Sequence, residues 1–265
     1  MTWDPASAEG AHLCAECGVI VLPAGAGWEH PGALRVKFSQ TVCGSPRPGR
    51  PAKDREVRYG RGNEVKQDNA VHGQVDDQPA AGGPIVVACD GSLKRNPDGP
   101  PWWPISWGYV ATNGQWGLGW TIQSAGVVGN RVLGAELRAI FWARERLPSG
   151  QPIEVLTDSA DAVGLTERWR GGDLVMPPGY SVERQSGNEA KMLLLARRVA
   201  SAPDAFQASW VRAGSGHPLH SAADALAKTA RLWAFKQISK DQARVDGARF
   251  ATGGLASWQR RSSRT

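Results

Sequence analysis

Two short apolar segments of this chain each end in an aspartate, and this pair of segments constrains the fold more than any other feature. Residues 85–92 read IVVACDGS, and residues 152–159 read PIEVLTDS. Short apolar runs bounded by turn residues are typical of buried strands. In open α/β sheets, functional sites form at the carboxyl ends of the strands. Asp90 and Asp158 are therefore predicted to stand where such a site would be built.

The sequence between and around these segments predicts an α/β domain over residues 84–235. Asn113-Gly114 separates two alternating segments, a strong signal for a β-hairpin. Residues 133–147 carry apolar positions at helical spacing. The expected order is strand, strand, strand, helix, strand, helix, helix, strand, helix. The segments are 85–92, 106–112, 115–124, 133–147, 152–159, 159–172, 188–201, 206–211 and 220–235. Strands joined through helices and through a hairpin give a mixed sheet flanked by helices.

Two further acids fall in predicted helices, Glu136 near the start of one and Asp224 in the last. Clustered carboxylates repel one another and raise each other's pKa unless cations neutralise them. Hard oxygen ligands suit Mg²⁺ or Mn²⁺. Two such ions about 3.5–4 Å apart can clamp the attacking and leaving oxygens of a phosphodiester displacement. The four acids therefore indicate a divalent metal site.

Four motifs in this region resemble type 1 ribonuclease H, in the order of that family. They read CDGSLKRNP, AELRAIFWA, LTDSADAV and WVRAGSGHPLHSAADALAKTA. The resemblance covers 84–235 and implies the ribonuclease H-like fold, a five-stranded mixed sheet flanked by helices. It implies a metal-dependent endoribonuclease that cuts the RNA strand of RNA–DNA hybrids with two Mg²⁺ or Mn²⁺ ions, leaving 3′-hydroxyl and 5′-phosphate ends.

The resemblance also implies a role for each acid. Asp90 would bridge both metals, and Asp224 would join it on the ion that activates the attacking water. Glu136 and Asp158 would join Asp90 on the ion that stabilises the leaving oxygen. Asn96 matches a residue that contacts the hybrid near the cut.

The chain departs from the family pattern at several positions. Gly214 stands where the family often carries a histidine that assists turnover, so either His217, our catalytic candidate, or His220 is expected to substitute. The polar run before the glutamate is replaced by GNRVLG, and Ala160 replaces a glutamine. Two alternatives stay open: a related DNA-cleaving nuclease such as a resolvase or transposase, and a nucleic-acid-binding module with weak or no activity.

Aromatic and basic residues near the predicted site are candidate substrate contacts. Aromatic rings can stack on the bases of a nucleic acid strand, and guanidinium or ammonium groups can hold phosphates. Trp102 and Trp103 lie in a proline-flanked loop, and Lys94, Arg95 and Arg212 flank the metal site.

The front segment, residues 1–43, holds a possible structural zinc site. Cys14 and Cys17 form a C-x-x-C pair, and His30 and Cys43 follow, each separated by 12 residues from the preceding candidate ligand. Three cysteines and a histidine can close a tetrahedral zinc site, with His12 as an alternative to His30. The other reading is a loose segment with an inert or occasionally oxidised cysteine pair. A small zinc-binding module would staple a stretch too short for its own core.

Composition assigns the remaining zones and limits the function classes. Residues 44–83 have few aliphatic side chains and many charges, which favours a flexible linker. Residues 236–265 hold seven basic and two acidic residues, which favours a disordered tail suited to a polyanionic partner. No apolar run of 18 residues and no signal-peptide pattern occur. We therefore expect a cytoplasmic protein with no membrane segment and no implied protein partner.

Overall fold

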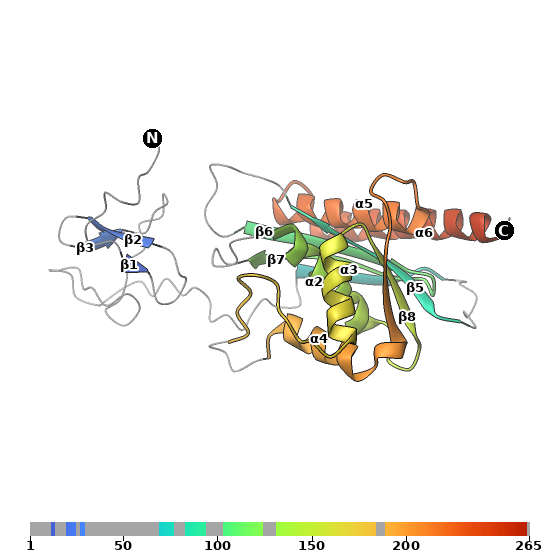
Figure 1. The fold of residues 1–265 in the computed structure, drawn as a ribbon. Helices are drawn as coiled ribbons and strands as arrows, with labels where there is room; N and C mark the ends of the chain where they lie inside the picture. Colours follow the sequence, from blue (N-terminus) through green and yellow to red (C-terminus); the bar gives the residue numbers. More distant parts are fainter. Residues whose placement is uncertain are drawn as a thin grey trace.

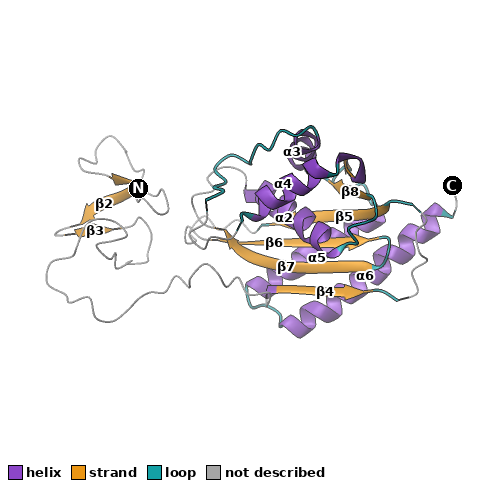
Figure 2. Ribbon diagram, turned by 90° about the horizontal axis from the view of Figure 1, so that it is seen from below, coloured by secondary structure: helices purple, strands orange, loops and turns teal. Residues whose placement is uncertain are grey.

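The computed structural model describes residues 12–13, 20–24, 27–29, 69–76, 83–93, 103–123, 131–183 and 189–263. Its centre is a six-stranded sheet in the order β4-β7-β6-β5-β8-β9 (Figure 2). The strands are β4 (Ala70–Gln74), β5 (Ile85–Ser92), β6 (Trp103–Ala111), β7 (Gln115–Gln123), β8 (Ile153–Thr157) and β9 (Phe206–Trp210). The pairs β5–β8 and β8–β9 are parallel, and the other neighbours are antiparallel. The predicted mixed sheet is confirmed.

Helices cover both faces of this sheet (Figure 1). They are α2 (Arg131–Arg146), α3 (Ala160–Arg170), α4 (Lys191–Ser201), α5 (Pro218–Ala234) and α6 (Lys240–Ser262), with a short 3-10 turn at Pro203–Ala205. Neighbouring side chains of β5 enter opposite cores: Val87 packs with α2 and α4, whereas Ala88 packs with α5 and α6. This alternation follows from the two-residue period of a strand and explains why the segment is apolar on both faces.

The hairpin between β6 and β7 turns at the predicted Asn113-Gly114 pair. The backbone amide of Gly114 donates to the carbonyl of Ala111 at 2.9 Å. Gly114 has a φ of 88°, in the left-handed region that glycine occupies at little cost. The Oδ1 of Asn113 accepts from the amide of Gln115, which closes the turn.

The sheet has one strand more than predicted, and this strand comes from the segment interpreted as a linker. β4 pairs antiparallel with β7, with Val71 opposite Leu118. Val71 is buried, and Gly73 lies so close to the indole of Trp116 that a Cβ there would be 2.5 Å from the ring. The linker interpretation is therefore wrong for residues 70–74, because β4 covers an otherwise exposed edge of the sheet.

The carboxyl-terminal segment is helical, so the prediction of a disordered tail is wrong. α6 packs on α5 and on the β4–β7 edge of the sheet. Its buried positions recur every four residues: Ala243, Gly247, Ala251 and Leu255. Three of these residues are small, so the buried face of the helix is narrow. Amphipathic helices are recognised in a sequence by large apolar side chains on one face, and α6 has few of them there.

The front segment contains a three-stranded antiparallel sheet of β1 (His12–Leu13), β2 (Ile20–Ala24) and β3 (Gly27–Glu29). The zinc ligands predicted there, Cys14, Cys17, His30 and Cys43, lie outside the described residues. In the part of the chain that the structure describes, no helix combines the length and apolar character needed to cross a bilayer.

Candidate active site

Asp90 is the sixth residue of β5 and lies opposite Gly108 of β6. A Cβ on Gly108 would be 2.6 Å from backbone atoms of α5, so this glycine allows α5 to lie directly on the sheet beside Asp90. The same argument holds for Gly91, where a Cβ would be 2.6 Å from the backbone nitrogen of Glu136. Gly91 thus brings α2 against β5, and Gly108 brings α5 against the neighbouring strand β6.

Glu136, on α2, is buried with both carboxylate oxygens engaged. Oε1 accepts from the backbone amide of Gly91 at 2.9 Å, and Oε2 accepts from the hydroxyl of Thr157 at 3.2 Å. Thr157 is the last residue of β8 and is fully buried. The glutamate is therefore tied to the residue after Asp90 and to the residue before Asp158, which fixes its orientation.

Asp158 follows β8 directly and is partly exposed. Its backbone carbonyl accepts from the indole Nε1 of Trp210 at 3.0 Å, and the carbonyl of Thr157 accepts from the amide of Val211. The end of β9 therefore holds the loop of Asp158 in place. Ser159 then caps α3, its hydroxyl accepting from the amide of Ala162.

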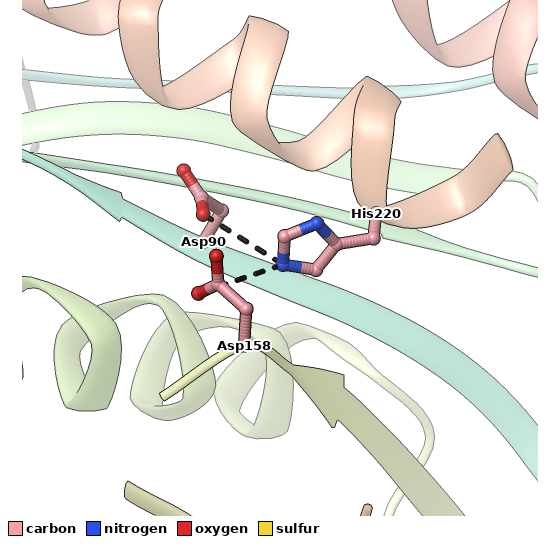
Figure 3. Close-up of side chains that lie close together, drawn as sticks. All are labelled: Asp90, Asp158 and His220. Atoms are coloured by element: carbon pink, nitrogen blue, oxygen red, sulfur yellow. Dashed lines mark ion pairs between the residues drawn. The ribbon is translucent and has the colours of Figure 1, made fainter. Parts of the chain in front are cut away.

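α5 contributes a histidine as well as the predicted aspartate. The Nε2 of His220 lies 3.8 Å from Oδ1 of Asp90 and 3.8 Å from Oδ1 of Asp158 (Figure 3). One ligand atom from each of these three residues lies within 4.8 Å of the others. His220 stands four residues before Asp224, so the two share one face of the helix. The carboxylate of Asp224 itself pairs with Lys228 at 2.6 Å.

Burial and mutual repulsion make this cluster electrostatically unfavourable without a cation. Burial, followed by the charges of Glu136, Asp224 and Asp158, raises the pKa of Asp90 to about 9. Burial is also the main cause that raises the pKa of Glu136 to about 7. A divalent cation would relieve this repulsion and keep the acids ionised at neutral pH. The donor set therefore fits a divalent metal ion.

His220 strengthens this fit. Burial lowers the pKa of its imidazole, so the ring is neutral at pH 7. Its Nε2 is buried and faces two carboxylates, and it has no hydrogen-bond partner among the described residues. A buried polar atom without a partner is costly, and such an atom in a carboxylate cluster indicates a group that would be satisfied by a ligand.

His217, the catalytic histidine candidate, occupies a different position. It is the N-cap of α5, its Nδ1 accepting from the amide of His220 at 3.4 Å. Its ring lies 5.3 Å from that of Trp258 on α6. Burial and the charges of His220 and Arg261 lower its pKa. Among the described residues, its contacts are those of a helix cap.

The predicted substrate contacts are mostly outside the described residues. Lys94, Arg95, Asn96 and Trp102 all lie there, and only the backbone of Trp103 is described, as the first residue of β6. Arg212 is exposed in the turn after β9. The sequence argument passed over Trp210, which is 55% exposed beside Asp158. Trp210 lies at the carboxyl end of a predicted strand, as Asp158 does, and this position could have marked it as a candidate site residue.

The chain is similar to known proteins in sequence and in structure. The family model for RNase H matches residues 83–231, more than half of the chain. A ribonuclease H from Anaeromyxobacter sp. (strain K) is 29% identical over 152 residues, which is 55% of this chain and 79% of that protein. A ribonuclease H from Tropheryma whipplei (strain Twist) is 31% identical over 157 residues, covering 55% and 83% respectively. The solved structure of LC9-RNase H1, a type 1 RNase H with the type 2 active-site motif, is 21% identical, covers 65% of this chain and 87% of that chain, and gives a TM-score of 0.37. The chain belongs to the RNase H family.

Proposed function

We propose that this protein is an endoribonuclease that hydrolyses the RNA strand of RNA–DNA hybrids with two divalent ions, Mg²⁺ or Mn²⁺. One observation carries the proposal: Asp90 and Asp158 converge with His220 at the carboxyl ends of two parallel strands. Glu136 and Asp224 raise the pKa of Asp90, so they lie within electrostatic range of the same point. Such ions would activate water and stabilise the oxygen that leaves phosphorus.

The chain's own residues hold and orient this site. The amide of Gly91 and the hydroxyl of Thr157 fix the orientation of the Glu136 carboxylate. Asp224 is held by Lys228, and its availability to a metal requires that this pair opens or shifts. In the proposed reaction a water oxygen bonds to phosphorus and the bond from phosphorus to the 3′ oxygen breaks. The products are a 5′-phosphate and a 3′-hydroxyl.

We assign to His220 the part that the family's missing histidine would play. The ring is neutral at pH 7 and faces the two aspartates, so its Nε2 can either hold a proton beside the scissile phosphate or donate its lone pair to the ion between them. Gly214 offers no side chain for either role.

The direct test uses three labelled substrates, an RNA–DNA hybrid, single-stranded RNA and duplex DNA, each with EDTA, Mg²⁺ or Mn²⁺. We expect cleavage of the hybrid alone, only with metal, and products carrying 5′-phosphates. Asp90→Asn should reduce cleavage to background while keeping the fold, because it removes the charge that both ions share. Cleavage of duplex DNA would favour the related nuclease, and tight hybrid binding without metal-dependent cleavage would favour a binding module.

The front segment carries a second proposal, that Cys14, Cys17, His30 and Cys43 hold one structural zinc ion. It rests on the residue types and spacing, and on a segment too short to form its own core. Zinc binding in such a module is coupled to its folding. Protein purified under reducing conditions without chelator should contain about one zinc ion per chain by elemental analysis. The double substitution Cys14→Ser/Cys17→Ser should remove it, and wild-type protein without zinc would refute the proposal.

A further inference from the structure

A groove of about 590 Å³ lies between the start of α5 and the second half of α6. Pro218 and Ser221 of α5 line one side, and Arg249, Arg260 and Arg261 of α6 line the other. This groove has no part in the carboxylate site described above. It is formed largely by the segment that composition alone suggested was a disordered basic tail.

Two adjacent glycines on α6 shape the groove. A Cβ on Gly254 would be 2.5 Å from the Cβ of Ala222, so this glycine lets α6 lie directly against α5. A Cβ on Gly253 would meet no atom of the described residues within 4 Å, although this residue also lines the groove. Gly254 therefore allows α6 to pack closely on α5 at this point. The absence of a side chain at Gly253 leaves room in the groove for a ligand.

The charge of the groove is incompletely neutralised. Arg249 pairs with Asp246 on its own helix at 3.0 Å. Arg260 donates to the hydroxyl of Ser257, a neutral group. Within the described ranges, neither Arg260 nor Arg261 has a carboxylate within ion-pair distance. Guanidinium groups match the geometry of phosphate oxygens and bind them in preference to most neutral ligands.

The groove is joined to the active site through one end of α5. His217, the N-cap of that helix, has its ring 5.3 Å from that of Trp258 on α6, and burial together with the charges of His220 and Arg261 lowers the pKa of His217. One turn further along, His220 faces Asp90 and Asp158. At about 1.5 Å per residue, the stretch of α5 between Pro218 and Asp224 is roughly 9 Å long. A nucleic acid strand crossing the start of α5 would therefore reach both places.

We propose that this groove binds the phosphodiester backbone of the nucleic acid substrate beyond the bond that is cut. The inference deepens the proposed function and rests on it for the identity of the substrate, an RNA–DNA hybrid. The groove offers guanidinium groups, open volume and proximity to the carboxylates, and its positive charge complements a polyanion. It adds affinity without taking part in bond cleavage.

The experiment measures hybrid binding by fluorescence anisotropy in EDTA, over a series of salt concentrations. Arg260→Gln/Arg261→Gln is compared with Lys240→Gln/Arg244→Gln, a control that removes two charges at the other end of the same helix, outside the groove. Losing two phosphate contacts should reduce the slope of log affinity against log salt by about 1–2 and weaken binding about tenfold near 0.1 M salt. The control should change affinity less than twofold.

A third variant tests the groove without removing an arginine. Gly253→Glu places an acid in open space on a helix, where the steric cost is small and helix propensity improves. Like the loss of the two arginines, this change should weaken hybrid binding. The midpoint temperature of thermal unfolding should stay the same or rise. Equal losses in the groove pair and the control pair, or an unchanged salt slope in the groove pair, would overturn the proposal.

The two proposals fail separately. If hybrid binding in EDTA depends on the groove but no cleavage occurs in Mg²⁺ or Mn²⁺, the groove proposal is supported and the nuclease mechanism is rejected. If metal-dependent cleavage occurs but the salt slope of Arg260→Gln/Arg261→Gln is unchanged, the nuclease mechanism is supported and the groove proposal is rejected. If both hold, the groove pair should raise KM about tenfold while kcat at saturating hybrid stays within twofold, because the groove contributes binding that is equal before and during the reaction.

Discussion

The backbone amide of Gly91 donates a hydrogen bond to Oε1 of Glu136 at 2.9 Å, which joins β5 to α2 one residue beyond Asp90. A side chain at position 91 would collide with the backbone of α2, because its Cβ would be 2.6 Å from the nitrogen of Glu136 and 2.7 Å from the Cβ of Ala135. The position of the glutamate in the site therefore depends on the absence of a side chain next to the first aspartate.

Gly91→Ala should accordingly displace α2 from β5. We expect a destabilisation of about 1–3 kcal/mol, as for other insertions into packed cores, and a loss of kcat that exceeds what the unfolded fraction explains. Urea unfolding and steady-state cleavage of a hybrid measure the two effects. Gly150→Ala is the matched control, since a Cβ there meets no atom within 4 Å in the part of the chain that the structure describes. A Gly91→Ala protein with wild-type kcat would contradict the role given to this contact.

Exchanging each of two histidines for asparagine separates a site residue from a helix cap. His220→Asn should lower kcat about 10- to 100-fold, the range typical of groups that support metal ligands. His217→Asn should leave kcat within about threefold, because asparagine is also a favourable N-cap. Hybrid cleavage at saturating substrate measures both, with circular dichroism to confirm folding. The reverse ranking would return the catalytic role to His217.

His72 of β4 should make the stability of the protein sensitive to mild acid. Burial, with a smaller effect of Arg146, lowers its pKa to about 4. Its ring lies 5.9 Å from that of Trp107 and 5.8 Å from that of Trp142, and Nδ1 is 3.1 Å from the hydroxyl of Tyr109. The folded state therefore binds fewer protons than the unfolded state between pH 6.5 and pH 4, so stability is full above pH 6.5 and falls as the pH drops through this window.

His72→Phe keeps an aromatic ring and removes the titration. The free energy of unfolding of the wild type relative to this variant should fall by about 1–3 kcal/mol from pH 7 to pH 4. Comparing the two proteins cancels the titration of the buried acids, which both contain. Urea unfolding at both pH values, in EDTA, measures the difference. A constant gap between the two proteins across this range would show that His72 is protonated in the fold.

The strands that carry the site were predictable because their signals are local. The segment ending in Asp90 is apolar on both faces and lies between helices, and the Asn113-Gly114 turn allows few alternatives. β4 was missed because it holds one buried aliphatic residue, Val71, in a stretch that is polar on average. Its stability comes from pairing with β7 and from covering Trp116, neither of which composition reveals.

The acids of the candidate site were named from the sequence, and His220 was named with them only as the alternative to His217. The acids lie at strand ends or in motifs, whereas His220 is identified by its position one helical turn before Asp224. That spacing places both on one face of α5, an argument the sequence alone allows. His217 was favoured because it lies in the glycine-rich loop, where function is commonly found, but there its side chain caps the helix.

Like β4, α6 was missed because most of its buried residues are small, and its contribution to stability can be tested directly. Leu255 is the one large side chain among the four residues buried every fourth position on this helix, and it is 1% exposed against α5 and the sheet. Leu255→Ala should therefore destabilise the domain by about 2–5 kcal/mol, the cost of emptying a buried leucine site. Val245→Ala, on the same helix but 63% exposed, should change stability by less than about 0.5 kcal/mol.

Denaturant unfolding of both variants, followed by tryptophan fluorescence, measures this difference. A cooperative transition shifted only for Leu255→Ala would show that α6 unfolds together with the sheet. Equal, small shifts for the two variants would mean that α6 adds no stability, as the interpretation of residues 236–265 as a tail predicted. α6 also forms one wall of the arginine groove. Leu255→Ala should therefore weaken hybrid binding only if α6 detaches from α5. Circular dichroism without denaturant measures independently whether α6 has detached.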